Sequence, residues 1–228
     1  FSHVNFRYPN AQEDVLSDID FVAEPGKTTA IIGSTGCGKS TLVNLIPRLY
    51  DVTGGSITMD GIDIRKLAMA ELREEIGFVP QKGVLFSGTI ASNLRFGKDD
   101  ATDEQIREAA EIAQASDFIA EKKEGYDSAI AQGGSNVSGG QKQRLAIARA
   151  IAKQPQVFIF DDSFSALDFK TDSTLRKALK EHTKDATTII VAQRISTILN
   201  ADKIIVLDDG HMALSLIHIS EPTRRVVI

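Results

Sequence analysis

The chain is poor in several features that would restrict its environment or its partners. Its 228 residues include a single cysteine, Cys37, so no disulfide can form within the chain, and a reducing compartment is favoured. No run of 18 apolar residues is present, so the sequence predicts no membrane-spanning helix. Basic residues are not in excess, because 26 Lys and Arg stand against 31 Asp and Glu. The net charge of −5 therefore disfavours nucleic acid as the main partner.

What the chain does contain fits an α/β domain. Hydrophobic residues make up 42% and charged residues 25%, which is ordinary for a globular protein of this length. Short apolar segments alternate with helical patterns, and this alternation predicts a mainly parallel sheet. The strands are expected at residues 4–8, 15–21, 27–32, 157–160, 187–191 and 203–207.

A separate helical lobe is expected inside this sheet domain. From residue 89 to about residue 131 the pattern is helical with few strand signals. Thr102 and Gln105, three residues apart before an apolar pattern, predict a capped helix start. A glycine-rich loop at 133–140 then leads into an amphipathic helix at 141–151. Its buried stripe is expected to be Leu145, Ile147, Ala148 and Ile151.

The strand expected at 27–32 runs directly into a glycine-rich segment. Gly33-x-x-x-x-Gly38-Lys39-Ser40 has the pattern of a phosphate-binding loop between a strand and a helix. Its glycines let successive N–H groups face a phosphate, and the helix N-terminus adds its positive dipole end. Lys39 is expected to bridge the β- and γ-phosphates, and the Ser40 hydroxyl to bind magnesium. We expect nucleotide to contact Gly33, Ser34, Thr35, Gly36, Cys37, Gly38, Lys39, Ser40 and Thr41, with Cys37 as a spacer and not a nucleophile.

Two neighbouring carboxylates end the strand expected at 157–160. In a nucleotide-hydrolysing site of this type, Asp161 is expected to hold magnesium and Asp162 to activate water. Asp162 is one methylene shorter than a glutamate. Whether the chain hydrolyses ATP or only binds it is expected to depend on that difference.

A second motif narrows the class of nucleotide-binding protein. The segment 138–144, Ser-Gly-Gly-Gln-Lys-Gln-Arg, follows the phosphate loop by about a hundred residues and resembles the signature motif of the ATP-binding cassette (ABC) family. Tyr8, Gln81 and the run 165–168 stand in the order that this family shows, and residues 84–94 resemble its exporter branch. The resemblance covers the chain to about Gly210. It implies a P-loop NTPase core with a mainly parallel sheet, an antiparallel β subdomain and a helical subdomain inserted at about 89–150.

The resemblance also implies roles in binding ATP and Mg²⁺. Tyr8 would stack on the adenine ring. Gln81 would reach magnesium or the attacking water and couple the site to membrane domains. Together with Asp162, Lys39 and the residue at position 193, it would belong to the catalytic machinery.

A further set of residues would serve a neighbouring domain. Ser138, Gly139, Gly140 and Gln141 would form an anion site for the γ-phosphate held by a partner, in a head-to-tail dimer with two ATP molecules. Asp168 would cross that interface. The implied partners are a second nucleotide-binding domain and a transmembrane domain outside this chain, at the cytoplasmic face of the inner cell membrane.

Two positions depart from the family pattern, and both belong to hydrolysis. Asp162 stands where active members usually have Glu, and Gln193 stands where they have a switch histidine. Gln can donate a hydrogen bond but has no titratable proton. We therefore expect the slow site of a heterodimeric exporter, whose intact signature completes the partner's competent site.

Other interpretations stay open. The chain could belong to a homodimeric exporter in which Asp162 is a slow but working base, and drift or sequencing error could explain both substitutions. A chromosome-maintenance or DNA-repair ATPase shares the cassette but usually carries a longer insert before the signature. A nucleotide-binding regulator without a transport role is the remaining alternative.

We expect the chain to be a fragment of a longer gene product, since it starts inside an expected edge strand. We expect the nucleotide-binding domain to span residues 1–213. Residues 214–228 resemble the translation of a sequencing-library transposon adapter, so they are expected to be non-native and are left out of the predicted fold. The alternative is a genuine short strand, because the apolar residues of this segment alternate.

Overall fold

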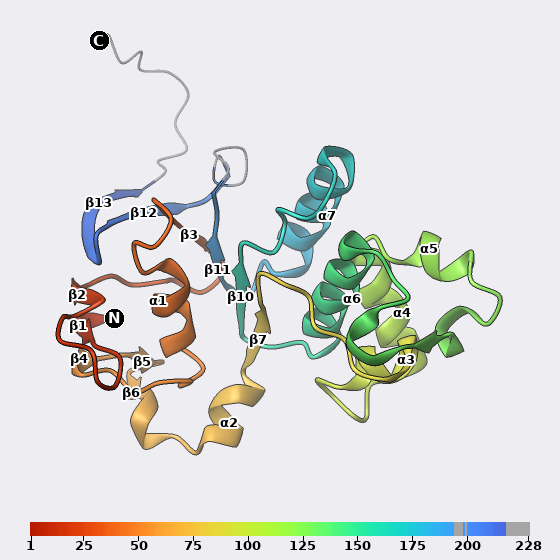
Figure 1. The fold of residues 1–228 in the computed structure, drawn as a ribbon, viewed down its shortest axis with the longest axis horizontal. Coiled ribbons are helices and arrows are strands. Elements are labelled where there is room, and N and C mark those ends of the chain that lie inside the picture. Colours follow the sequence, from red (N-terminus) through yellow and green to blue (C-terminus); the bar gives the residue numbers. More distant parts are fainter. Residues whose placement is uncertain (194–197, 199, 218–228) are drawn as a thin grey trace, which may run out of the picture.

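A six-stranded sheet forms the centre of the molecule in the computed structural model, which describes residues 1–193, 198 and 200–217 (Figure 1). The strand order is β13-β12-β3-β11-β10-β7, and all neighbours are parallel except β12 and β13. Parallel strands end at one edge of a sheet, so the loops after β3, β11, β10 and β7 lie together. The strands are β3 (Thr28–Gly33), β7 (Ile76–Val79), β10 (Val157–Asp161), β11 (Thr187–Val191), β12 (Lys203–Asp208) and β13 (His211–Ile217).

The two faces of this sheet contact different layers. In β10, Phe158 and Phe160 belong to one buried cluster, whereas Ile159 belongs to the other. Successive side chains of a strand point to opposite faces, so a strand covered on both sides must be apolar throughout. This explains the continuous apolar run that predicts β10. The helices at the sheet are α1 (Lys39–Leu45), α2 (Met69–Glu74) and α7 (Phe169–His182), with a short 3₁₀ turn at Ile64–Lys66.

The antiparallel part lies beside α1 on one side of the molecule (Figure 1). A three-stranded sheet has the order β2-β1-β4, and a hairpin pairs β5 with β6. Val4 and Leu16 of the three-stranded sheet share a buried cluster with Leu42 of α1. These strands are β1 (Ser2–Phe6), β2 (Leu16–Ile19), β4 (Gly54–Ser56), β5 (Thr58–Met59) and β6 (Ile62–Asp63).

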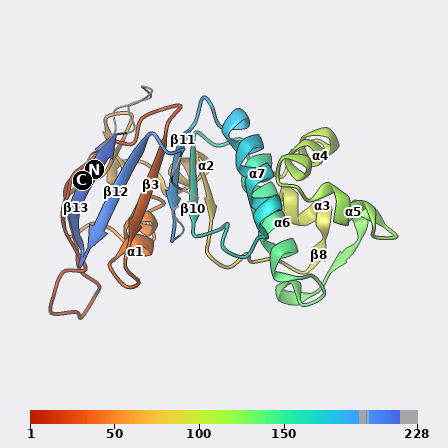
Figure 2. The ribbon, with the colours of Figure 1, turned by 90° about the horizontal axis from the view of Figure 1, so that it is seen from above.

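The helical lobe lies at the opposite end of the molecule, with α6 and α7 between the sheet and the remaining helices (Figure 2). The predicted cap is confirmed, since Thr102 Oγ1 accepts from the N–H of Gln105 at 3.3 Å and Gln105 Oε1 accepts from the N–H of Thr102 at 2.9 Å. The helices are α3 (Ile90–Arg95), α4 (Asp103–Ile112), α5 (Ser116–Ala120) and α6 (Gly139–Ala152).

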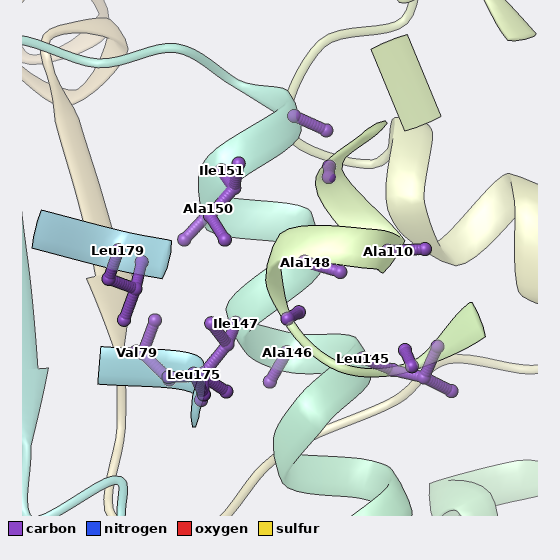
Figure 3. Packing of buried hydrophobic residues seen from close by; sticks show 14 of the residues in the cluster. Val79, Ala110, Leu145, Ala146, Ile147, Ala148, Ala150, Ile151, Leu175 and Leu179 are labelled. Carbon is purple, nitrogen blue, oxygen red and sulfur yellow. The ribbon is translucent and has the colours of Figure 1, made fainter. Parts of the chain in front are cut away.

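Helix α6 carries the main buried stripe of this lobe. The four residues predicted to be buried, Leu145, Ile147, Ala148 and Ile151, are at most 2% exposed. Figure 3 shows them among Ala110 of α4 and Leu175 and Leu179 of α7. The helix is therefore packed on more than one side, which fixes its direction relative to the sheet.

The lobe is not helical throughout. Gly88–Thr89 (β8) and Ala129–Ile130 (β9) form a short antiparallel pair. One 3₁₀ turn, Gly125–Asp127, precedes β9, and another, Gln132–Gly134, follows it. Two-residue strands are too short to show a period of two, so the sequence pattern does not reveal them. No helix in residues 1–193, 198 and 200–217 is both long and apolar enough to cross a membrane.

The end of the described chain differs from the predicted fold. Residues 214–217, which the sequence analysis leaves out of the fold, continue β13, where Leu216 pairs with Ile204 and Ile217 with Lys203. An edge strand needs only backbone donors and acceptors from its partner, and the alternating side chains of this segment allow it. The non-native origin of the segment stays a prediction, and residues 218–228 lie outside the described residues.

Candidate active site

A small hollow lies where the predicted chemistry-bearing loops meet, at the carboxyl ends of β3, β7, β10 and β11. Its volume is about 220 Å³. Four loops distant in sequence contribute to it because their strands are neighbours in the sheet. The lining residues are Thr35, Gly36, Gly38, Lys39, Ser40, Thr41, Gln81, Asp161, Asp162, Val191 and Gln193.

The phosphate loop contributes the floor of this hollow. Gly36 and Gly38 have φ angles of 87° and 99°, a region that side chains with a Cβ disfavour. A Cβ at Gly36 would point into open space, whereas a Cβ at Gly38 would come within 2.7 Å of Leu16. The loop thus has its open side at Gly36 and its packed side at Gly38.

The side chain of Lys39 hydrogen-bonds to the backbone at the start of its own loop. Its Nζ donates to the carbonyl oxygens of Gly33 and Ser34 at 2.9 and 2.6 Å and lies 3.6 Å from the sulfur of Cys37. Cys37 is 5% exposed and belongs to the buried cluster beneath the loop. Gly33, Ser34 and Cys37 therefore contact the Lys39 side chain but do not line the hollow, whereas Lys39 does line it.

Ser40 and Asp161 place two hard oxygen ligands side by side. The Ser40 hydroxyl donates to Oδ1 of Asp161 at 3.0 Å. Burial raises the pKa of Asp161, the neighbouring Asp162 charge raises it further, and the Ser40 hydrogen bond and Lys39 partly offset both. A cation beside this carboxylate would compensate the cost of burying its charge. Magnesium typically takes one or two protein oxygens and completes its shell with phosphates and water, so these residues fit it.

Asp162 is the centre of a hydrogen-bond network. Its Oδ2 accepts from Nε2 of Gln193 at 2.9 Å and from Nε2 of Gln81 at 3.3 Å. Its backbone has a φ of 46° and its N–H donates to Val191 at 3.0 Å, so the residue is held in an unusual turn conformation. A positive φ in a residue with a side chain is strained and often marks a functional site. The structure thus joins three of the four residues that the sequence assigned to the catalytic machinery, all except Lys39.

Tyr8 approaches the site from the antiparallel sheet. Its hydroxyl lies 3.0 Å from the hydroxyl of Thr41, and its ring meets Phe6 and Tyr50 edge-on, with centroid distances of 4.8 and 5.2 Å. Tyr50 has no motif around it in the sequence, and only the fold reveals it as a neighbour of Tyr8. The ring of Tyr8 is half-buried next to the phosphate loop but does not line the hollow.

The signature residues lie away from this hollow, at the start of α6. Ser138 caps the helix, since its Oγ accepts from the N–H of Gln141 at 3.2 Å and its own N–H donates to the Gln141 side chain at 3.0 Å. Ser138 and Gly139 are exposed. The N–H groups of the first turn lack partners within a helix, so Gly139 and Gly140 can present donors at this surface.

Asp168 starts α7 in the same manner. Its side chain accepts from the N–H and the hydroxyl of Thr171 at 3.0 and 2.6 Å, and these bonds lower the pKa of Asp168. It is exposed and does not line the hollow. The predicted site residues therefore form two groups, one converging at the sheet edge and the other on the surface of α6 and α7.

One buried polar residue of the signature segment 138–144 has no role of its own in the sequence predictions. Gln143 of α6 is 1% exposed and hydrogen-bonds the backbone on both sides of Gln81. The sequence signal for it is its place in the signature segment 138–144, but that segment does not show that this side chain is buried against the loop of Gln81.

Comparisons with known proteins agree with this arrangement. A family model described as ABC transporter matches residues 16–165. An uncharacterized ABC transporter ATP-binding protein of Mycobacterium tuberculosis is 51% identical over 208 residues, which cover 90% of this chain and 35% of that protein. A Staphylococcus aureus protein whose name describes a multidrug export ATP-binding/permease protein is 47% identical over 210 residues, covering 92% and 36% respectively.

The fold is similar to that of a solved exporter. The structure of a bacterial Atm1-family ABC exporter with ATP bound matches with a TM-score of 0.90 and 39% identity, over 94% of this chain and 37% of that chain. The chain spans little more than a third of the length of the proteins that it matches.

Proposed function

This chain belongs to the ABC transporter family, and from that premise we propose that it binds MgATP in a head-to-tail pair of such domains and drives export across a membrane. The ATP-binding domains of this family are ATPases, and the exporter relatives place this chain in the exporter branch. The convergence of the phosphate loop, Asp161 and Gln81 at one sheet edge carries the proposal. The relatives give no support to a chromosome-maintenance or regulatory role.

Residues of the hollow, and Tyr8 beside it, have distinct roles in the proposed binding of MgATP. The N–H groups of the phosphate loop and the α1 N-terminus hold the β-phosphate, and Lys39 turns its ammonium from the loop carbonyls to the phosphates. Ser40 and Asp161 would hold magnesium, together with the side-chain oxygen of Gln81. The cation would supply positive charge beside the phosphate oxygens. Tyr8, fixed by Thr41 and Tyr50, offers its ring to the adenine.

We propose that this site hydrolyses ATP slowly, and the contacts of Asp162 support this. A general base must offer a lone pair to the attacking water. The lone pairs on Oδ2 of Asp162 already accept hydrogen bonds from the amide N–H groups of Gln193 and Gln81. Gln193 cannot become charged, so it adds no positive charge toward the γ-phosphate. The site is then suited to hold ATP for a long time.

The exposed signature supports a composite site with a partner. Ser138, Gly139 and Gly140 would complete the γ-phosphate site of the facing domain, and Asp168 would contact the same interface. We favour a non-identical half-transporter as that partner, because this chain combines an altered hydrolytic network with an intact signature. A homodimer in which Asp162 acts as a slow base is the alternative.

An apolar groove next to the Gln81 loop supports contact with a membrane-spanning part. The groove has a volume of about 390 Å³ and Pro80, the residue before Gln81, is part of its lining. Leu49, Val84 and Phe96 line it and are 50%, 51% and 60% exposed. Contiguous exposed apolar surface of this kind marks interaction sites. We propose that it binds the membrane-spanning part at the cytoplasmic face of the membrane.

A single-turnover experiment tests the proposal. The chain is mixed with limiting radiolabelled MgATP, and hydrolysis is compared with the Asp162→Glu, Gln193→His double variant. We expect tight binding by both and a rate about 10- to 100-fold higher for the double variant. Equal rates would refute the slow site while leaving ATP binding intact. Failure of the unmodified chain to bind MgATP would refute the whole proposal.

A further inference from the structure

Gln143 fastens the loop that carries Gln81 to the signature helix. Its Oε1 accepts from the N–H of Gly83 at 2.8 Å, and its Nε2 donates to the carbonyl of Pro80 at 3.1 Å. These two backbone groups flank Gln81, one residue before it and two residues after it. One side chain thus fixes both ends of the segment, and with them the position from which Gln81 reaches Asp162.

The contact between loop and helix is close as well as hydrogen-bonded. A Cβ at Gly83 would lie 2.8 Å from the carbonyl oxygen of Lys142 and 3.1 Å from Cα of Gln143. Glycine is therefore required for the loop to lie directly on α6 at this point. The side chain of Gln143 is 1% exposed, so water does not replace its bonds when they are lost.

Only an amide satisfies both backbone groups at once. A glutamine supplies one acceptor for the N–H of Gly83 and donors for the carbonyl of Pro80. Glutamate in its place could still accept from the N–H of Gly83. Its second carboxylate oxygen, however, could not donate to the carbonyl of Pro80. Methionine would keep the volume and leave both backbone groups without a partner. The residue type at this position therefore follows from the loop it holds.

We propose that Gln143 is a positioning residue for ATP hydrolysis, acting through Gln81. This rests on the proposed function, in which Gln81 meets the magnesium and the attacking water. Gln81 is exposed at the hollow, and its bond to Asp162 is the longer of the two that Asp162 Oδ2 accepts, 3.3 Å against 2.9 Å for Gln193. Its placement thus depends on the loop backbone. Reacting groups tolerate displacements of well under 1 Å, so loosening this loop slows the chemical step more than it weakens binding.

Asn93 offers a matched control in the same lobe. It is 2% exposed, and its amide also bridges a backbone N–H and a carbonyl, both of Phe86, at 2.9 and 2.8 Å. Asn93→Leu removes these two bonds and also those to the Thr89 carbonyl and the Arg149 guanidinium, but it leaves the Gln81 loop on α6. It reports the effect of lost stability without displacement of Gln81.

The test measures kcat and KM for ATP in the Asp162→Glu, Gln193→His background, where turnover is measurable. Adding Gln143→Met is expected to lower kcat about 10- to 100-fold and change KM less than threefold. Gln143→Glu should show the same pattern. Asn93→Leu should lower the melting temperature at least as much, because Asn93 makes more side-chain hydrogen bonds than Gln143, and should leave kcat within twofold.

Gly83→Ala provides a second test in case Gln143→Met does not fold, because it displaces the loop while the Gln143 side chain stays unchanged. It is expected to reproduce the kcat loss. If Gln143→Met or Gly83→Ala folds and keeps kcat at the level of Asn93→Leu, the positioning role is refuted while the proposed function stands. Absence of ATP binding in the parent background would refute the proposed function and this inference together.

Discussion

Gln193 donates from its Nε2 to Oδ2 of Asp162 over 2.9 Å, across the carboxyl ends of the neighbouring strands β11 and β10. The sequence pattern identifies these two residues separately, as two departures from one family. In the structure they form one contact, and Gln81 donates to the same oxygen at 3.3 Å. A change at either residue therefore alters the partner's hydrogen bonding, and the effects of the two changes are coupled.

This coupling predicts non-additive effects on hydrolysis. Asp162→Glu and Gln193→His are expected to raise the single-turnover rate by much less separately than together, because neighbours in one network interact energetically. The measurement is a double-mutant cycle on the hydrolysis rate. Gln12→His, a change of the same kind at an exposed residue, should leave the rate unchanged. Strictly additive effects would show that the bond has no role in the chemical step.

The buried carboxylate of Asp161 is expected to lower the free energy of unfolding of the domain. Burial raises its pKa, so stability falls as the pH rises from the ordinary aspartate pKa through the raised one. Asp161→Asn removes the buried charge and keeps an oxygen that can accept from Ser40. At pH 7 it should raise the melting temperature by about 2–4 °C for each 1 kcal/mol gained, and abolish the magnesium dependence of ATP binding.

Calorimetric melting and ATP titration with and without magnesium check this prediction. Asp100→Asn, at an exposed residue, is the matched control and should change neither quantity. A lower melting temperature for Asp161→Asn would contradict the assigned cost of burying the charge.

The phosphate loop predicts different results for two of its glycines. Both Gly36 and Gly38 have positive φ angles, so alanine strains either position by about 1–2 kcal/mol. At Gly38 the new Cβ would also meet Leu16 at 2.7 Å, whereas at Gly36 it would meet no atom within 4 Å. Gly38→Ala should therefore lower stability clearly more than Gly36→Ala.

ATP affinity should show the opposite order, with the larger loss for Gly36→Ala and the smaller loss for Gly38→Ala. The open side of the loop at Gly36 is where a phosphate would lie, so Gly36→Ala should lose ATP binding while the domain stays folded. Denaturant unfolding and ATP titration on both variants provide the comparison. Equal losses of stability would contradict the packed and open sides assigned to the loop.

The parts predicted from the sequence are those with a local signal. The phosphate loop, the carboxylates after β10 and the Thr102 cap each depend on residues close together in the chain. The convergence of the phosphate loop with the two carboxylates follows from the parallel strands, which bring their carboxyl ends to one edge of the sheet. The contact of Gln193 with Asp162 depends on strand neighbours, and so needed the structure.

The parts that were missed depend on contacts between distant segments. Gln143 lies about 60 residues from the backbone it holds, and although it stands in the signature segment 138–144, the sequence does not show which backbone groups it contacts. Tyr50 is a neighbour of Tyr8 only through the fold. The β8–β9 pair is stabilised by backbone pairing of two-residue strands, which side-chain patterns report poorly.

Arg149 provides a test of the proposed membrane-facing groove. Its guanidinium donates to the carbonyls of Val84 and Asn93 at 3.0 and 2.9 Å and lies over the rings of Phe86 and Phe96, 5.2 and 5.5 Å from their centroids. Burial lowers the pKa of Arg149 to about 10, so it remains charged at neutral pH. It therefore supports the exposed apolar residues of the groove from below.

Arg149→Lys keeps the charge but cannot reproduce the planar set of bonds and stacking. Losing hydrogen bonds of a buried charged group should cost about 2 kcal/mol, or about 4–8 °C in melting temperature for a domain of this size. Arg107→Lys, at an exposed residue of α4, should cost almost nothing. ATP affinity should stay unchanged in both, because Arg149 does not line the ATP hollow. In the full-length transporter, transport-coupled ATPase activity should fall for Arg149→Lys alone, since the groove that receives the membrane-spanning part loses its support. A fall in ATP affinity equal to the fall in coupled activity would instead place the effect of Arg149 at the nucleotide site and contradict the assignment of the groove.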